Sequence, residues 1–168
     1  GSLVALNAAL AKVTYAPEKD FNGADAITVG VDDLNYLGSG GPLTAKGTVT
    51  VTVKPVNDPP VFDNTDLRFT INENESAWTI GGNVNATDIE NDLITYEITK
   101  GNTGNAFRMS AISGLITINE GVILDYEKIN RYNLEVVAKD GGATATLAGA
   151  IPAKVTIEVL NVNEAPTV

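Results

Sequence analysis

The sequence predicts an all-β protein, and three observations lead to this prediction. Apolar and polar residues alternate with a period of two in several short segments, and no long segment shows the 3.6-residue period of a helix. These segments are rich in Val, Ile, Thr and Tyr, which favour strands. Clusters of Gly and Asn, which are typical of turns, separate them. Many short strands with turn signals between them indicate a β-sandwich.

The strand pattern is clearest near the end of the chain. In the segment KVTIEV at 154–159, Val155, Ile157 and Val159 fall on one face, and a threonine and a glutamate fall on the other. Antiparallel strands that are buried on one face and solvated on the other have this pattern. We expect further strands of this type at Thr48–Val53, Ile94–Ile98 and Asn133–Ala138.

A proline-containing motif occurs twice and divides the chain. Residues 53–62 read VKPVNDPPVF and residues 159–168 read VLNVNEAPTV, and each motif follows an alternating strand. Proline fixes its own φ and donates no hydrogen bond to a ladder, so each motif is expected to be a stiff connector at a domain end. The stretch between the motifs has about 105 residues, the size of one seven-stranded sandwich. We therefore predict a complete domain over residues 59–168.

Residues 1–58 are too few for a second complete sandwich. We expect at most four strands there, at Leu3–Leu6, Ala11–Tyr15, Ala24–Val31 and Thr44–Val53. The segment is interpreted as the C-terminal part of a sandwich whose first half is not in this sequence, or as a small sheet packed on its neighbour. Its exposed strand edges would favour aggregation unless a second copy or the neighbouring domain covers them.

The composition limits the chemistry that the chain can perform. With 11 Lys and Arg against 21 Asp and Glu, the formal net charge is −10, which disfavours binding to nucleic acid or to anionic membranes. No apolar run approaches the roughly 20 residues of a membrane span, so we expect no membrane insertion. The chain has no His and no Cys, which excludes nitrogen–sulfur zinc sites, Ser-His and Cys-His nucleophiles and disulfides. Paired carboxylates and oxygen ligands for a hard cation such as Ca²⁺ remain.

The acidic residues between 59 and 168 lie off the predicted strands, and antiparallel strand order predicts that they gather at two ends of the domain. A strand that begins after Glu127 and ends at Asp140 separates these two residues by roughly 30 Å. One end would hold Asp88, Glu90 and Asp140, and the other would hold Glu73, Asp125, Glu127, Asn163 and Glu164. Two carboxylates about 4 Å apart repel by about 4 kcal/mol at an effective dielectric constant near 20. Such clusters favour a bridging divalent cation, and solvated surface charge is the alternative.

The motifs that carry these acids resemble the cadherin repeat family, in order and in spacing, over nearly all of 59–168. They are Asn72-Glu73-Asn74, Ala86-Thr87-Asp88-x-Glu90-Asn91, Leu124-Asp125-Tyr126-Glu127, Ala138-x-Asp140-Gly141 and Asn161-Val162-Asn163-Glu164-Ala165-Pro166. The resemblance implies a Greek-key, seven-stranded sandwich with Ca²⁺ ions between consecutive repeats, which stiffen the joint. It also implies the ligand positions, which are Glu73, Asp88, Glu90, Asn91, Asp125, Glu127, Asp140, Asn163 and Glu164. This sequence departs from the family where Tyr126 replaces an arginine and Glu90 replaces an aspartate.

Residues 3–58 resemble the end of the tandem cadherin-like or immunoglobulin-like repeats of very large bacterial surface proteins and secreted adhesins. The motifs include Val13-Thr14-Tyr15-Ala16-Pro17 and Asp20-Phe21-Asn22-Gly23. When Tyr15-Ala16-Pro17-Glu18 is placed beside Leu124-Asp125-Tyr126-Glu127, Glu18 falls at the joint between the two domains. There it would join Asn57 and Asp58 and face the Asp88, Glu90 and Asp140 group.

These observations predict a non-enzymatic repeat segment of a bacterial extracellular adhesin that Ca²⁺ makes rigid, with neighbouring repeats of the same chain as partners. A module that binds polysaccharide or a like domain on another cell is the alternative. A glycosidase would need a carboxylate pair about 5 to 10 Å apart in an aromatic cleft, whereas here the acids cluster in threes. Trp78 and Tyr96 are expected to pack within strands and not to serve as sugar platforms.

Overall fold

The computed structural model describes residues 3–33, 41–141 and 151–165. The chain divides into two compact units, Gly1–Val56 and Asn57–Val168. The last three residues of the second proline motif lie outside the described residues. Each unit is described by itself.

The first unit contains one helix and one antiparallel ribbon. Helix α1 spans Leu3–Leu10, and strands β1 (Gly23–Asp32) and β2 (Thr44–Val53) pair along their whole length. The predicted strands at Ala24–Val31 and Thr44–Val53 are therefore confirmed. Within the ribbon, Ile27 lies opposite Val49 on a face of mostly aliphatic side chains, and threonines dominate the other face.

Two strand predictions in this unit are wrong. Leu3–Leu6 belongs to α1, whose sequence LVALNAAL consists mainly of Leu and Ala, two strong helix formers, and shows no alternation. Ala11–Tyr15 forms a turn and irregular chain, because β1 and β2 pair with each other and no described strand pairs with this segment. A period-two pattern over a few residues does not specify a strand unless a partner is available.

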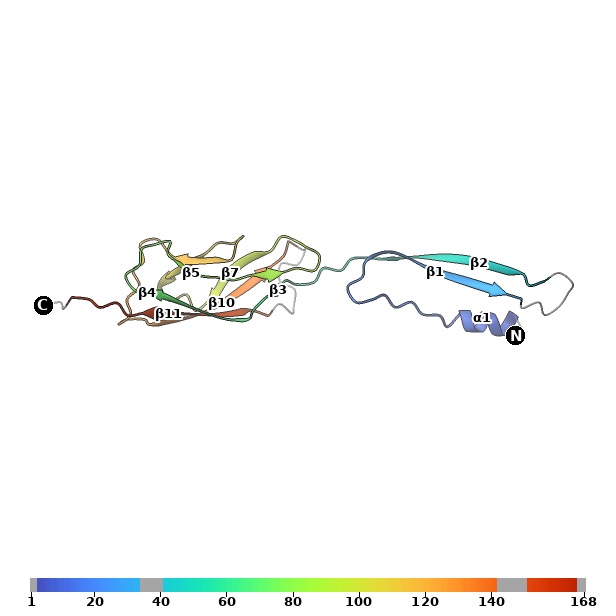
Figure 1. Ribbon diagram of the computed structural model, residues 1–168, viewed down its shortest axis with the longest axis horizontal. Coiled ribbons are helices and arrows are strands. Elements are labelled where there is room, and N and C mark those ends of the chain that lie inside the picture. The colour runs from blue at the N-terminus through green and yellow to red at the C-terminus, as the bar shows by residue number, and fades with distance from the viewer. Residues whose placement is uncertain (1–2, 34–40, 142–150, 166–168) are drawn as a thin grey trace. The chain divides into compact units, whose positions relative to one another are not determined.

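The second unit is a β-sandwich. The two larger sheets have the strand orders β4-β11-β10-β7 and β5-β9-β8, and a small sheet joins β3 and β6 (Figure 1). The strands are β3 (Val61–Phe62), β4 (Asp66–Asn72), β5 (Ile80–Asn83), β6 (Ala86–Thr87), β7 (Thr95–Lys100), β8 (Phe107–Met109), β9 (Leu115–Ile118), β10 (Arg131–Lys139) and β11 (Ala153–Leu160), with a 3-10 turn at Thr103–Asn105. The predicted all-β sandwich is confirmed.

Pairing in the four-stranded sheet differs from the prediction at one place. β10 is antiparallel to both β7 and β11, as the alternating pattern indicates. However, β4 and β11 run parallel over seven residue pairs, from Asp66↔Lys154 to Asn72↔Leu160. After β4 the chain crosses to the other sheet, and it returns to the side of β4 only as its last strand. Such non-consecutive neighbours are produced by crossover connections, which the local pattern of one strand does not reveal.

The core lies between the two larger sheets. Tyr132, Leu134 and Val136 of β10 are buried at every second position, as the alternation predicts. They belong to one core cluster with Ile116 and Ile118 of β9, and the rings of Phe107 and Tyr132 meet edge to face with centroids 5.0 Å apart. Such a pair stabilises the core by about 0.5 to 1.5 kcal/mol beyond its burial.

The two aromatic side chains discussed above have different environments. Tyr96 is half-buried on β7, packs against the core, and accepts a hydrogen bond from the Ala86 N–H at 3.0 Å, so its prediction is confirmed. Trp78 lies in a turn before β5 and is 52% exposed. The prediction that it packs within a strand is wrong, because Trp78 lies in a turn at residues 77–78 and the next strand begins only at Ile80.

Candidate metal centres

One acidic group lies where β4, β10 and β11 meet at one end of the second unit. Glu73 directly follows β4, and Asp125 and Glu127 precede β10. One carboxylate oxygen from each lies within 4.8 Å of the others, and within the described ranges no other three Asp or Glu residues meet this condition. The structure therefore brings together three acids that the sequence places up to 54 positions apart.

Glu73 is the structural centre of this group. Its side chain is buried, with 3% exposed, and its two oxygens accept hydrogen bonds from the backbone N–H groups of Tyr126 and Val162, both at 2.8 Å. Its own N–H donates to the Leu160 carbonyl at 3.0 Å. One buried carboxylate thus joins the loop after β4, the loop before β10 and the segment after β11. Each oxygen can accept a further bond, because a carboxylate oxygen has two lone pairs.

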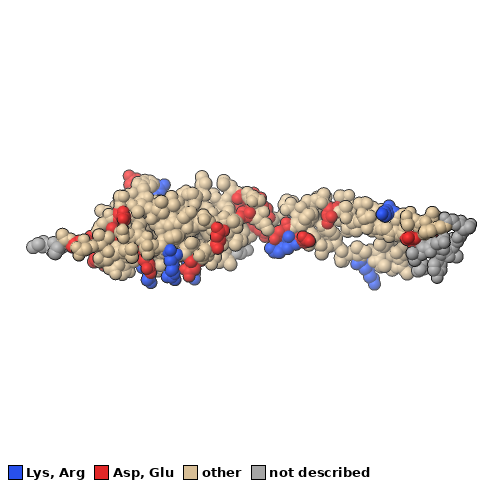
Figure 2. All heavy atoms as spheres, viewed as in Figure 1, with Lys and Arg blue, Asp and Glu red and all other residues tan. Residues whose placement is uncertain are grey.

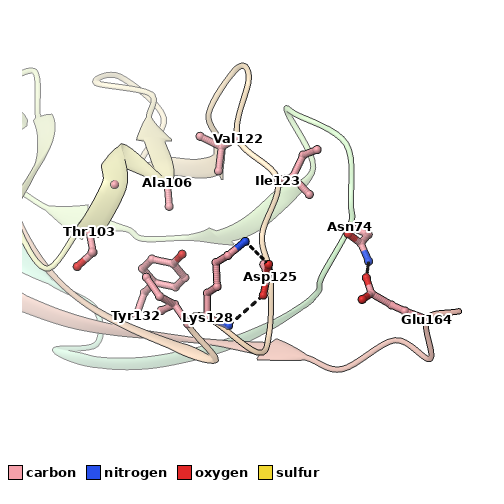
Figure 3. A pocket seen from close by; sticks show the side chains of 11 residues that line it. Asn74, Thr103, Ala106, Val122, Ile123, Asp125, Lys128, Tyr132 and Glu164 are labelled. Carbon is pink, nitrogen blue, oxygen red and sulfur yellow. Dashed lines mark hydrogen bonds and ion pairs between the residues drawn. The ribbon is translucent and has the colours of Figure 1, made fainter. Parts of the chain in front are cut away.

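Asp125 also forms an ion pair with a lysine. The Lys128 ammonium lies 2.6 Å from Asp125 Oδ2, and the Lys128 N–H donates to Oδ1 at 2.9 Å (Figure 3). The hydrogen bond from Lys128 lowers the pKa of Asp125 below its ordinary value, and the same contact raises the pKa of Lys128. The ammonium therefore neutralises part of the negative charge of the group.

The segment after β11 contacts the same end of the unit. The Asn161 amide donates to Glu127 Oε1 at 3.0 Å, and the Asn74 amide donates to Glu164 Oε1. Asn163 is exposed in the same segment. The predicted residues Glu73, Asp125, Glu127, Asn163 and Glu164 therefore all lie at this end, as predicted from strand order.

A second group lies at the opposite end of the unit. Asp140 directly follows β10, whose nine residues span roughly 30 Å, and it is 7% exposed. The Asn57 amide donates to Asp140 Oδ2 at 3.1 Å, and the Asp58 N–H donates to Glu90 Oε2 at 3.3 Å. The first two residues of the unit thus contact acids from two separate loops.

Asp88 organises the loop that carries Glu90 and Asn91. Its Oδ1 accepts the N–H groups of Glu90 at 2.9 Å and of Asp92 at 3.0 Å. Asn91 has a φ of 61°, and its N–H donates to the Asp88 carbonyl at 3.2 Å. Asp88 Oδ2 is buried without a hydrogen-bond partner among the described residues. A buried carboxylate oxygen without a partner costs about 1 to 3 kcal/mol or more, which a cation at this point would offset.

Glu18, the remaining predicted ligand, belongs to the first unit. It is exposed in the segment between α1 and β1, and its carbonyl accepts the Phe21 N–H at 3.2 Å. Its place beside the Asp88 group stays a prediction.

Both groups consist of oxygen donors only, and this donor set fits Ca²⁺. Carboxylates, side-chain amides and backbone carbonyls are the ligands that this hard cation prefers. Figure 2 shows acidic side chains at both ends of the second unit. Sequence reasoning missed the Lys128 contact and the N–H groups of Tyr126 and Val162. The lysine three positions after Asp125 could have been recognised in the sequence as a possible ion-pair partner, whereas no residue type marks the hydrogen bonds of a backbone N–H.

The described part of the chain contains no helix that is both long and apolar enough to cross a membrane. A family model, described as "Cadherin domain", matches residues 67–160, which run from β4 to the end of β11. The match therefore includes both larger sheets and the loops that carry Glu73, Asp88, Asp125 and Asp140.

Several curated proteins are similar to this chain. Human Cadherin EGF LAG seven-pass G-type receptor 2 is 36% identical over 132 residues, which are 77% of this chain and 4% of that protein. Human Protocadherin Fat 1 is 40% identical over 126 residues, 73% of this chain and 3% of that protein. The chain thus spans only a small part of the length of these relatives.

Solved structures show the same fold. Mouse clustered PcdhgC3 EC1-3 has a TM-score of 0.64 at 24% identity, covering 87% of this chain and 46% of that one. Mouse Cadherin-23 EC22-24 has a TM-score of 0.60 at 28% identity, covering 82% of this chain and 42% of that one. With a family match over more than half of its residues, the chain belongs to the cadherin domain family.

Proposed function

We propose that this chain is a Ca²⁺-binding segment of an extracellular adhesin and that Ca²⁺ makes it rigid, so that it acts as a structural spacer in cell adhesion. Cadherin domains are in general extracellular, Ca²⁺-binding, non-enzymatic adhesion modules. The observation that carries the proposal is the Glu73–Asp125–Glu127 group, in which three carboxylates meet beside the segment that leaves the domain.

The end with Glu73 would hold Ca²⁺ through the three carboxylates. Ca²⁺ takes about 6 to 8 oxygen ligands at about 2.3 to 2.6 Å, so further ligands must come from neighbouring groups. Asn163 and Glu164 lie in the adjoining segment and can supply them. Ca²⁺ would neutralise carboxylates that otherwise repel one another. It would also connect the domain to the segment that follows β11, and a joint held at several points bends less.

The end with Asp88 would form the corresponding centre toward the preceding repeat. Its residues are Asn57, Asp58, Asp88, Glu90, Asn91 and Asp140, and Glu18 of the first unit would complete it. Support comes from the partnerless buried Oδ2 of Asp88 and from the contacts of Asn57 and Asp58 with Asp140 and Glu90. This proposal assigns 1–58 to the C-terminal part of one repeat and 59–168 to a complete repeat.

The comparisons also extend into residues 1–58. The alignments with the relatives and the solved structures cover 73 to 87% of the chain, which is more than residues 59–168 alone provide. Neighbouring repeats of the same chain are the partners that a spacer requires. Our assignment to a bacterial cell-surface or secreted adhesin rests on the sequence motifs of residues 3–58.

The energetic effect of binding follows from mass action. For a site with a dissociation constant of about 10 to 100 µM, millimolar Ca²⁺ adds about 1.4 to 2.7 kcal/mol per ion to the stability of the folded state. Folded domains are stable by only about 5 to 15 kcal/mol, so two or three ions would change the stability substantially.

Thermal unfolding in EDTA, in 1 mM Ca²⁺ and in 1 mM Mg²⁺ tests this proposal. We expect a Ca²⁺-specific rise in melting temperature that is smaller in Glu127→Gln and in the double variant Asp88→Asn plus Asp140→Asn. Glu97→Gln is the matched control, because Glu97 is an exposed strand residue paired with Lys139. Superimposable curves for the wild type in EDTA and Ca²⁺ would show that the acidic loops are surface charge. A direct homophilic or polysaccharide-binding role would then be favoured.

A further inference from the structure

The outer face of the β5-β9-β8 sheet carries a mixed aromatic, cationic and apolar patch. Ile80 of β5 and Arg108 of β8 both pair with Thr117 of β9, so these three side chains share one face of the sheet. The opposite face packs into the core. Ile80 is 62% exposed. We call the surface formed by Trp78, Ile80 and Arg108 the Trp78–Arg108 patch; Thr117 itself is buried, with 9% exposed.

The backbone holds Trp78 in a costly conformation. Its φ of 74° lies in the left-handed region, which is unfavourable for a bulky residue by about 1 to 3 kcal/mol. The Trp78 N–H donates to the Ile118 carbonyl at 2.9 Å, and the Ile118 N–H donates to the Thr79 carbonyl at 3.0 Å. Two backbone hydrogen bonds therefore fix the turn to the end of β9 and present the indole at the surface. Strain of this kind is typical of positions with a function.

Arg108 completes the patch. Its guanidinium carbon lies 4.2 Å from the centroid of the Trp78 ring. Arg68 and Arg131, the other two arginines, each form an ion pair with a carboxylate, whereas in the described ranges Arg108 forms none. Stacking uses the flat face of the guanidinium and leaves its in-plane N–H donors available. Those donors form a fork that matches a carboxylate.

We propose that the Trp78–Arg108 patch binds a uronic acid residue of an acidic polysaccharide. The part of the indole that Arg108 leaves exposed offers an apolar surface against which the C–H face of a pyranose ring can pack, and the Arg108 fork pairs with the sugar carboxylate. The requirement for a carboxylate comes from charge complementarity, because an unpaired guanidinium stands out on a chain with a net charge of −10. The proposal does not depend on Ca²⁺.

The size of the patch favours a sugar over an acidic protein. A stable protein interface buries more than about 1,000 Å² and contains several anchoring residues. A single sugar residue requires one stacking surface and a polar group that fixes its orientation, and the patch offers the indole and the Arg108 guanidinium. The negative charge of the chain opposes a polyanion, but salt screens this repulsion beyond about 8 Å at physiological ionic strength. We expect a weak site, with a dissociation constant on the order of 1 mM.

The test uses the intrinsic fluorescence of Trp78, which is the single tryptophan of the chain. The 168-residue protein is titrated with trigalacturonate, both in EDTA and in 1 mM Ca²⁺, and saturation-transfer NMR of the ligand gives a second readout. We expect a saturable signal in both buffers. Neutral galactotriose and triglutamate should bind at least about tenfold more weakly, because each lacks either the carboxylate or the sugar ring.

Arg108→Gln is the decisive variant because it removes the fork from an exposed side chain that the core does not need. It should weaken trigalacturonate binding at least about tenfold, while Arg131→Gln, which changes an arginine of the other sheet, should bind like the wild type. Circular dichroism checks that both variants are folded. Three results would each overturn the proposal. These are a failure of trigalacturonate to saturate the signal in both readouts, binding of trigalacturonate by Arg108→Gln as tight as by the wild type, and binding of triglutamate as tight as that of trigalacturonate. None of these outcomes affects the Ca²⁺ test, which measures melting temperature.

Discussion

Replacement of Glu73 by glutamine separates the structural role of this residue from its proposed role as a Ca²⁺ ligand. Both carboxylate oxygens accept a backbone N–H at 2.8 Å in a buried position. A glutamine side chain can accept one of these bonds, but its amide then faces the second N–H donor. The loss of one charge-assisted hydrogen bond costs about 1.5 to 3 kcal/mol, and the unsatisfied N–H adds about 1 kcal/mol or more.

We therefore expect Glu73→Gln to lower the free energy of unfolding by about 2.5 to 4 kcal/mol even in EDTA. Urea denaturation in EDTA measures this structural part, and the difference between EDTA and 1 mM Ca²⁺ measures the ligand part, which should shrink in the variant. Glu75→Gln is the matched control, since Glu75 is less buried and its carboxylate accepts one longer bond, from Asn72 at 3.3 Å. Wild-type stability of Glu73→Gln in EDTA would refute the hydrogen-bond argument. An undiminished Ca²⁺ increment would refute the ligand assignment.

Three further predictions concern single residues of the second unit. Gly101→Ala should lower the melting temperature by several degrees, because the glycine has a φ of 80° and a Cβ there would overlap the Asn133 carbonyl oxygen. Calorimetry measures the melting temperature, and an unchanged value would contradict the prediction. Lys128→Met should tighten Ca²⁺ binding, as measured by isothermal titration calorimetry, because the ammonium no longer neutralises Asp125. Equal or weaker binding by the variant would argue against a Ca²⁺ site at Asp125. Burial, and to a lesser extent Asp125, raise the pKa of Tyr132 above its ordinary 10.0. The stabilisation that the neutral Tyr132 side chain provides should therefore be complete below pH 10 and be lost as the pH rises further. Urea midpoints at pH 9 and pH 11 check this, and Tyr132→Phe should lack that part of the loss.

The sequence predicted the second unit better than the first for a physical reason. In β10 and β11 the alternating residues face a large core, so the hydrophobic pattern and the tertiary structure specify the same strands. In the first unit few residues are buried, so the alternating hydrophobic pattern competes with the intrinsic helix or strand preference of the residues. Leu3–Leu10 is helical because its Leu and Ala residues favour a helix and no strand among the described residues pairs with it.

Strand order also explains why the acidic residues of the second unit could be assigned to its two ends. A strand of nine residues keeps whatever precedes it and follows it about 30 Å apart, so Glu127 and Asp140 could be assigned to opposite ends. The partners within each end could not be predicted in this way. The N–H of Val162 reaches Glu73 only because β11 lies beside β4, a parallel pairing that the sequence does not reveal.

Residue types and their alternation were enough to predict the oxygen-only donor chemistry, the sandwich class and the division of the acids between two ends. Composition and period-two alternation are local properties, and each can be read directly from the residues. The folded domain was needed to establish which carboxylates meet, that Lys128 pairs with Asp125, and that Trp78 is exposed beside Arg108. These features depend on crossovers and turns that bring distant segments together, and a side chain's neighbours across a sandwich are set by the packing of the whole domain.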